Sequence, residues 1–353
     1  MNRLVRLALV LLTAATVVSC GQPTAQKSIG VVAPLTGEGA TYGASMKRGI
    51  ELAMEGSGIK LIYEDDKLSP KDGVAAIQKL ISLDNVSIVY GSAASGVTSA
   101  IVPIADQNKV VLFSSISTAD SLNNAGPYFF RNVPANSIQG KTAAEFVANT
   151  LKGHTVAIFN KNDEYGTNLA SSFRQHVRAL GLQIAYDSSY QPTDTDFRNQ
   201  LLKIKNAGVD AVFIPGNYQD TGIILKQASE LGITAVWIGG DGSYSPSLLQ
   251  YAGPAAEGFI CTIMAVDQTT PMYKDFESRF LKAYGRKPDV YDTYAYEAGL
   301  ILRQLVEKGG ANYKQILDST TFNSFSGPLK FVNGQVDRAY GLVQVKNGQF
   351  VPR

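Results

Sequence analysis

Short apolar runs alternate with helical patterns along the first part of the chain. Apolar residues recur three or four positions apart around 46–53, 74–81 and 97–104, which is the spacing of one helix face. The runs between these segments are too short for helices and are typical of buried strands; they are 28–33, 59–64, 87–90 and 109–113. This β-α-β-α-β-α-β order predicts a parallel sheet with helices on both faces and right-handed crossovers.

A second cycle of the same kind follows. Runs at 155–159, 183–186, 211–214 and 235–238 predict strands, and Leu169, Phe173 and Val177 mark a helix after the first of them. The final part of the chain breaks the alternation, with helices expected near 270–286 and 289–308 and then short strands separated by the turn signals Asn333-Gly334 and Asn347-Gly348. The sequence therefore predicts an α/β protein with two doubly wound parallel sheets.

The N-terminus has the pattern of an export signal. Arg3 and Arg6 precede an apolar run from Leu7 to Val18, which is shorter than the roughly 20 residues that a membrane-spanning helix needs. The stretch Val17-Val18-Ser19-Cys20 looks like a bacterial lipobox, in which the Cys20 thiol receives diacylglycerol and becomes the new N-terminus. An ordinary secretory signal with an incidental cysteine is the alternative. We expect a signal peptide at 1–19, a lipidated tether at 20–27 and an exported body, periplasmic or at the cell surface, that meets the membrane through its lipid only.

Composition narrows the classes of partner. The chain has 353 residues, of which 45% are hydrophobic and 18% charged, so it can bury a core and is long enough for two domains. Lys+Arg 32 and Asp+Glu 30 are nearly balanced and form no basic block, which argues against nucleic acid as a partner. If Cys20 is acylated, Cys261 has no disulfide partner, and its apolar setting predicts a small buried side chain in a strand.

Several short motifs carry a family resemblance that covers nearly all of the mature chain. They are Ala33-Pro34-Leu35-Thr36-Gly37 followed by Tyr42-Gly43, Tyr63-Glu64-Asp65-Asp66, Tyr90-Gly91-Ser92, Asp163-Glu164-Tyr165-Gly166 and Ala295-Tyr296-Glu297-Ala298. In this order and spacing the sequence resembles the type I periplasmic binding proteins of the leucine/isoleucine/valine-binding family, the receptor components of amino-acid ABC importers. The resemblance implies two lobes joined by three crossovers, with lobe 1 at 27–133 plus 265–337 and lobe 2 at 134–264 plus 338–353.

The same resemblance implies a function and its partners. We expect a monomeric receptor that binds a small amino acid, aliphatic or uncharged, between the lobes and passes it to ABC permease subunits. Two alternatives stay open: a ligand-sensing module of the same fold without a transporter, and a receptor for an amide- or urea-type solute. A neighbouring permease and ATPase gene would separate the first of these from a transport receptor.

The loop from Gly91 to Thr98 follows a predicted strand and opens a predicted helix. It superficially resembles the phosphate loop of nucleotide hydrolases, but Val97 stands where that loop needs lysine, so a nucleotide is not expected. The start of a helix offers unpaired N–H groups to an anion, and the Ser95 hydroxyl can add a hydrogen bond to a carboxylate. A simple capping role for Ser92 or Ser95 is equally open.

The resemblance assigns further residues to the ligand. It places Thr118 and the backbone of Ile116 at the ligand carboxylate, to which the helix start already assigned Ser95, although the run 114–120 could be only a turn. It places Asp241 at the ligand ammonium, where the family often has Glu, although Asp241 could be only a turn residue. It places Tyr42, Tyr165 and Tyr291 around the ligand side chain, although any of them could simply be core. Asn217 replaces an expected aromatic residue and small residues replace bulkier ones, so the pocket is expected to be larger or more polar; the other pocket residues are Ala93, Ala94, Ser117, Tyr218 and Gly242.

Residues for catalysis or metal binding are sparse. His154 and His176 have no ligand spacing between them, and no Cys or acidic cluster stands beside them. No Gly-x-Ser-x-Gly elbow is evident. The sequence therefore predicts a binding protein without catalytic residues, metal or cofactor.

Overall fold

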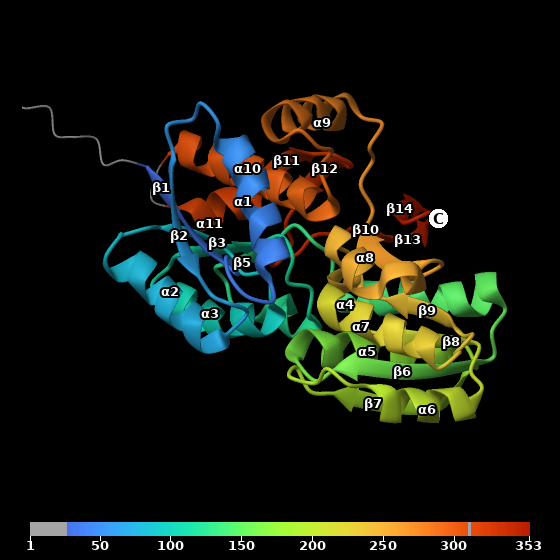
Figure 1. Ribbon diagram of the computed structural model, residues 1–353. Coiled ribbons are helices and arrows are strands. Elements are labelled where there is room, and N and C mark those ends of the chain that lie inside the picture. Colours follow the sequence, from blue (N-terminus) through green and yellow to red (C-terminus); the bar gives the residue numbers. More distant parts are fainter. Residues whose placement is uncertain (1–26, 310–311) are drawn as a thin grey trace, which may run out of the picture.

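The computed structural model describes residues 27–309 and 312–353, which form two α/β bodies, each built on its own sheet (Figure 1). The predicted export signal, the lipobox and Cys20 lie outside these residues. The fold class predicted from the alternating pattern is confirmed, because both bodies have a sheet of mainly parallel strands covered by helices. Short 3₁₀ or π segments join several of the elements.

The sheet of lobe 1 has five parallel strands in the order β2-β1-β3-β4-β5. Its alternating apolar residues point to two sides: Val31 packs with α1 and α10, whereas Val32 packs with α2 and α3. Both faces are therefore buried. The elements of this lobe are β1 (Ser28–Ala33), α1 (Ala40–Met54), β2 (Lys60–Asp65), α2 (Pro70–Ser82), β3 (Ile88–Gly91), α3 (Ser95–Gln107), β4 (Val111–Ser114), β5 (Phe129–Arg131), α9 (Pro271–Tyr284), α10 (Val290–Lys308), α11 (Tyr313–Ser319) and the hairpin β11 (Thr321–Ser324) with β12 (Gly327–Lys330).

The sheet of lobe 2 has seven strands in the order β14-β13-β10-β9-β8-β6-β7. Its first five strands in sequence are parallel, and the C-terminal pair β13–β14 adds to the β10 edge in the antiparallel sense. Asn347 and Gly348 both have positive φ between β13 and β14, so the predicted Asn-Gly turn is confirmed. The elements are α4 (Asn136–Glu145), β6 (Thr155–Lys161), α5 (Glu164–Ala179), β7 (Gln183–Tyr190), α6 (Arg198–Ala207), β8 (Ala211–Ile214), α7 (Tyr218–Glu230), β9 (Val236–Gly239), α8 (Pro246–Ala252), β10 (Ile260–Met264), β13 (Tyr340–Lys346) and β14 (Gln349–Pro352).

The chain passes between the two lobes three times, after β5, after β10 and after β12. Arg338, in the third passage, donates two hydrogen bonds to the carboxylate of Glu297 at 2.6 and 2.9 Å and one to the carbonyl of Asn132, in the first passage. One buried guanidinium thus joins α10 to two of the passages. We keep the lobe limits 27–133 plus 265–337 and 134–264 plus 338–353 as our proposal, because each passage lies at one of them.

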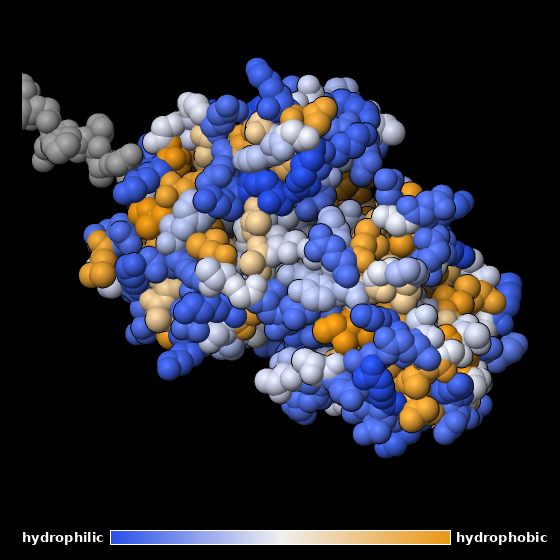
Figure 2. Space-filling model, in the orientation of Figure 1, coloured by the Kyte–Doolittle hydropathy of each residue, from blue (hydrophilic) through white to orange (hydrophobic). Residues whose placement is uncertain are grey.

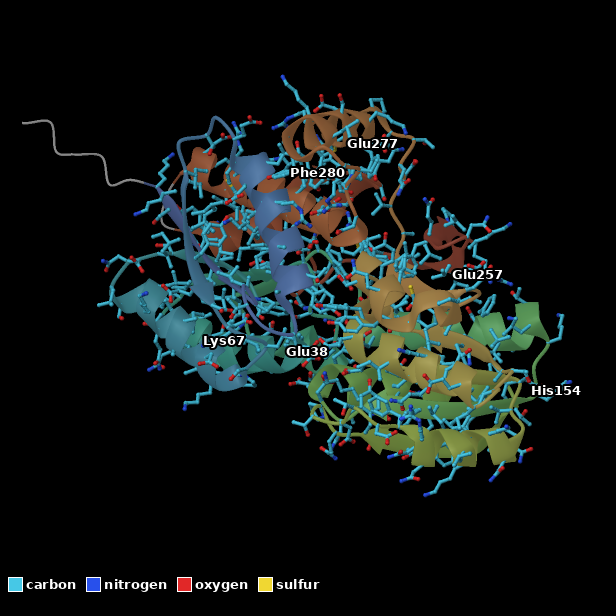
Figure 3. All side chains as sticks on the ribbon, in the orientation of Figure 1. Glu38, Lys67, His154, Glu257, Glu277 and Phe280 are labelled. Atoms are coloured by element: carbon cyan, nitrogen blue, oxygen red, sulfur yellow. The ribbon has the colours of Figure 1, made fainter. Side chains whose placement is uncertain are left out.

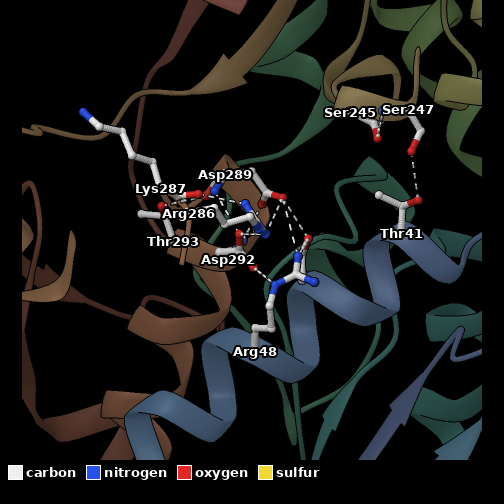
Figure 4. Close-up of polar contacts among 10 residues, drawn as sticks. Thr41, Arg48, Ser245, Ser247, Arg286, Lys287, Asp289, Asp292 and Thr293 are labelled. Atoms are coloured by element: carbon white, nitrogen blue, oxygen red, sulfur yellow. Dashed lines mark hydrogen bonds and ion pairs between the residues drawn. The ribbon is translucent and has the colours of Figure 1, made fainter. Parts of the chain in front are cut away.

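The start of α10 is fixed by a buried ionic cluster. Asp289 and Asp292 accept each other's backbone N–H in a capping box, and Arg48 of α1 donates to Asp292 at 2.8 Å (Figure 4). Gly49 of α1 faces the same turn, where a Cβ would come within 2.5 Å of the Asp292 carbonyl oxygen. This close packing sets the position of Tyr291, which points into the cleft between the lobes.

The outer surface offers no broad apolar face in the view of Figure 2, where hydrophilic side chains separate small apolar patches. Among residues 27–309 and 312–353, no helix has both the length and the hydrophobicity to cross a membrane. Cys261 lies in β10 and is fully buried, as predicted, and this burial raises the pKa of its thiol.

Candidate functional site

A cavity of about 540 Å³ lies between the lobes, at the carboxyl ends of the parallel strands. Loops that follow β1, β3 and β4 in lobe 1 and β6, β8 and β9 in lobe 2 converge there, which is where ligands bind in sheets of this kind. Glu38, at the junction of the lobes, and Lys67 are labelled in Figure 3. The cavity wall consists of Glu38, Tyr42, Lys67, Leu68, Pro70, Ala93, Ala94, Ser95, Gly96, Val97, Ile116 and Tyr291 of lobe 1, with Lys161, Asp163, Glu164, Tyr165, Pro192, Asn217, Asp241 and Gly242 of lobe 2.

Asp241 is the most buried acid in this wall, with 5% of its surface exposed. Its Oδ1 atom accepts hydrogen bonds from Gln139 Nε2 at 3.0 Å, the Tyr165 hydroxyl at 2.7 Å and the Gly242 N–H at 3.0 Å. Its Oδ2 atom accepts no hydrogen bond from any residue that the structure describes. One carboxylate oxygen is therefore held in place, and the other is left for a ligand.

Burial dominates the electrostatics of Asp241 and raises its pKa to about 6, although the three donors on Oδ1 oppose this shift. A ligand ammonium beside Oδ2 would favour the ionised carboxylate and lower that pKa. Binding of an amine in the closed cleft therefore requires Asp241 to lose its proton when the pH is below about 6.

Affinity for an amino acid should consequently fall as the pH drops through 6, by up to tenfold per pH unit below it. Isothermal titration calorimetry at pH 7.5, 6 and 5 measures this, and buffers of different ionisation enthalpy report the proton released. Asp241→Asn has no proton to lose there and should bind weakly with no such dependence. Equal wild-type affinity at pH 7.5 and pH 5 would contradict the role given to Asp241.

Gln139 positions Asp241 and was not predicted from the sequence. Its Oε1 atom accepts from the Asp241 N–H at 3.0 Å and from the Thr262 hydroxyl at 2.9 Å, while its Nε2 donates to Asp241 Oδ1. Both ends of one buried amide thus hold Asp241. A glutamine inside a helix carries no motif, so no signal in the sequence points to it.

Ser95 is the first residue of α3 and lies in the cavity wall. The N-cap residue is Ala94, without any side-chain cap, so the simple capping role considered for Ser92 or Ser95 is wrong. Ser95 Oγ accepts from the Ala119 N–H at 3.2 Å, and its own O–H donates to none of the described residues. Ser92 Oγ donates to Asp66 at 2.5 Å and accepts from the Ala94 N–H at 3.4 Å, before the helix begins. The first turn of α3 therefore offers an anion a hydroxyl and unpaired N–H groups.

The residues after β4 fit the predicted carboxylate site only partly. Ile116 lines the cavity, but its N–H already donates to Ser114 Oγ at 3.3 Å. Thr118 does not reach the wall; it is fully buried, and its hydroxyl has no hydrogen-bond partner among the described residues. Ser117 also lies behind the wall, where its hydroxyl bonds Thr98 and the Ser92 carbonyl.

Tyrosines of both lobes line the cavity. Of the residues predicted for the side-chain pocket, those that line the cavity are Tyr42, Tyr165, Tyr291, Ala93, Ala94, Asn217 and Gly242. Tyr218 does not line it. Its ring packs behind Tyr42 at 5.1 Å between centroids, and its hydroxyl donates to the Glu38 carbonyl at 2.5 Å. This contact replaces the direct role that the sequence predicted for Tyr218.

Polar contacts between the lobes close the cleft. Glu164 of lobe 2 accepts hydrogen bonds from the Ser99 and Ser121 hydroxyls of lobe 1 at 2.6 and 2.5 Å. Tyr42 donates to the Gly242 carbonyl, and Thr41 meets Ser247 at 3.4 Å (Figure 4). The structure therefore shows the lobes closed on each other.

His154 and His176 lie outside the cavity wall. His176 Nδ1 contacts the Ser172 carbonyl within α5 at 2.8 Å, and His154 directly precedes β6. In the part of the chain that the structure describes, no group of three or more His, Cys, Asp or Glu residues is placed to hold a metal ion.

Comparison with known proteins identifies the class to which this fold and cleft belong. The sequence profile of the family described as Periplasmic binding protein matches residues 26–349. The chain belongs to the type I periplasmic binding proteins of the leucine/isoleucine/valine-binding family, so the predicted resemblance is confirmed.

Individual relatives are similar over almost their whole length. Leu/Ile/Val-binding protein homolog 2 of Brucella abortus (strain 2308) is 30% identical over 326 residues, which cover 90% of this chain and 87% of the relative. A leucine binding protein LivK from Thermotoga maritima has a TM-score of 0.88 and 27% identity, covering 93% of this chain and 97% of that one. The branched-chain amino acid transporter substrate binding protein LivJ from Streptococcus pneumoniae, in complex with isoleucine, has a TM-score of 0.86 and 25% identity over 92% of this chain and 97% of that one.

Proposed function

We propose that this protein is an exported receptor that binds an α-amino acid with an uncharged side chain between its lobes and delivers it to the permease of an ABC importer. The observation that carries the proposal is Oδ2 of buried Asp241, which accepts no hydrogen bond from the described residues and lies in the same cavity as the Ser95 hydroxyl and the first turn of α3. An ammonium fits the first group and a carboxylate the second. Asp241 is in lobe 2 and Ser95 in lobe 1, so one zwitterion would contact both lobes.

The relatives support a binding role rather than catalysis. The Brucella and Thermotoga relatives are named as binding proteins, and the Streptococcus relative is a transporter substrate binding protein with bound isoleucine. We therefore propose a monomeric solute receptor that is not an enzyme and needs no cofactor.

Ligand binding should hold the lobes closed. A ligand shifts an equilibrium only through its difference in affinity for the two states, and contacts with both Asp241 and Ser95 exist together only in the closed state. A thermal-shift screen of the standard L-amino acids selects the ligand, and small-angle scattering should then give a smaller radius of gyration for the saturated protein. No thermal shift with any amino acid, or identical scattering of free and saturated protein, would contradict the proposal.

Membrane attachment is the second part of the proposal and rests on the lipobox at 17–20. Cys20→Ser lacks the thiol that would carry diacylglycerol, so this variant should leave the membrane fraction of an expressing bacterium and become soluble. Cell fractionation with an antibody against the body of the protein measures this, and Cys261→Ser is the matched control. Retention of the Cys20→Ser variant in the membrane would overturn the lipid anchor.

A further inference from the structure

Three polar residues of the cavity wall form a hydrogen-bonded group that the sequence did not indicate. Glu38 of lobe 1 pairs its Oε1 with Lys161 Nζ at 2.8 Å and accepts from Asn217 Nδ2 at 3.4 Å, and both of these partners belong to lobe 2. Lys161 is almost fully buried and also pairs with Asp220 at 2.8 Å. We call Glu38, Lys161 and Asn217 the polar group.

A row of tyrosines connects Asp241 to the polar group. The Tyr42 ring packs edge to face against Tyr291 at 5.3 Å and against Tyr218 at 5.1 Å. At the two ends of this row, the Tyr291 hydroxyl donates to the Asp241 carbonyl and the Tyr218 hydroxyl to the Glu38 carbonyl. An amino acid whose ammonium lies at Asp241 would therefore extend its side chain along Tyr42 toward the polar group.

The polar group has both kinds of hydrogen-bonding capacity left over. Glu38 Oε2 accepts no hydrogen bond from the residues that the structure describes, so it can take one from a ligand donor. Lys161 has three ammonium protons and, among the described residues, two carboxylate partners, so one N–H remains for a ligand acceptor. A ligand end that both donates and accepts would satisfy Glu38 and Lys161 together.

We propose that the polar group selects an α-amino acid whose side chain ends in a neutral amide. The amide NH₂ donates to Glu38 and its carbonyl accepts from Lys161. An aliphatic end would bury these charged groups and would not replace the hydrogen bonds that they make to water. A carboxylate end would face Glu38, and an ammonium end would face Lys161. The inference rests on the proposed function and narrows the ligand of the same cavity.

The direct test is isothermal titration calorimetry of the complete exported protein with ligands of similar length. L-glutamine should bind at least about tenfold more tightly than L-methionine, which has a similar length but no hydrogen-bonding amide. L-glutamate and L-lysine should each bind more weakly than L-glutamine, because each brings a charge that one member of the polar group repels.

Variants separate recognition by Glu38 from its second role in holding the lobes together. The Glu38 side chain is 35% exposed, so Glu38→Leu should fold. It should lower the glutamine-to-methionine preference about tenfold. Ser121→Ala is the matched control, since Ser121 is not part of the cavity wall and its hydroxyl donates to Glu164 across the two lobes, so its loss should weaken both ligands by the same factor.

The outcomes distinguish the inference from the proposed function. Methionine or leucine binding as tightly as glutamine, glutamate or lysine binding more tightly, or an unchanged preference in Glu38→Leu would overturn the amide assignment while leaving the amino-acid receptor intact. Failure of every standard amino acid to bind would overturn the proposed function itself.

Discussion

Replacing Asp241 with alanine should weaken amino-acid binding about a hundredfold or more, because the ligand ammonium would then be buried without a counter-charge. Removal of one member of a buried charge pair costs a few kcal/mol, and each 1.4 kcal/mol is about tenfold in affinity. Titration calorimetry with the amino acid chosen by the thermal-shift screen measures the loss. Equal affinity of wild type and Asp241→Ala would show that Asp241 does not bind the ligand ammonium.

Two further variants define what Asp241 contributes. Asp163→Asn removes another acid from the same cavity wall but keeps the side-chain cap on the Gly166 N–H, since Asn also caps helices, so it should change affinity less than tenfold. Asp241→Glu restores the charge and should recover part of the affinity. A loss in Asp163→Asn as large as in Asp241→Ala would indicate that general charge, rather than Asp241 Oδ2, binds the ammonium.

Arg338→Met should lower the free energy of unfolding by about 3–5 kcal/mol, because it leaves the Glu297 carboxylate buried without its partner. The side chains of Arg338 and Glu297 are only 7% and 2% exposed. Urea unfolding followed by circular dichroism measures the change as a lower midpoint.

A solvent-exposed pair is the natural control for this variant. Arg198 and Glu230 lie 2.9 Å apart with side chains 48% and 45% exposed, so solvent screens the pair and Arg198→Met should leave the urea midpoint almost unchanged. Similar midpoints for Arg338→Met and Arg198→Met would show that the buried pair adds no special stability. The double variant Arg338→Met with Glu297→Leu should recover part of the loss, because no charge then stays buried alone.

Local patterns predicted most of the secondary structure because each lobe buries its helices and strands with regular periods. Val31 and Val32 illustrate the limit of this information: both are apolar, and only the finished sheet shows that they face different helices. The C-terminal strands were predicted as strands, but their pairing with β10 in lobe 2 depends on contacts between distant segments. Such pairings leave no local period in the sequence.

The sequence predicted those residues of the candidate site that could be matched one by one to family motifs. It did not predict the residues that come together only when the two lobes close. Asp241, Ser95 and Tyr42 do line the cavity, whereas Thr118 lies just behind its wall. Glu38 and Lys161 are isolated charges far apart in sequence, and they meet only across the closed cleft. Gln139 is equally hidden, because its role comes from the loop that packs against its helix.

The hydrogen bonds that orient Asp241 have a kinetic consequence. The three donors to Asp241 Oδ1 belong to lobe 2, like Asp241 itself; they are Gln139, Tyr165 and Gly242. Ser95 and the rest of the first turn of α3 belong to lobe 1. Each half of the site is therefore assembled within one rigid body before the cleft shuts. An arriving zwitterion can form its encounter complex on either half without waiting for side chains to rearrange, and the reorganisation that remains is the rotation of one lobe toward the other. We expect association rates to reflect diffusion and lobe rotation, and the lifetime of the complex to carry the selectivity among amino acids.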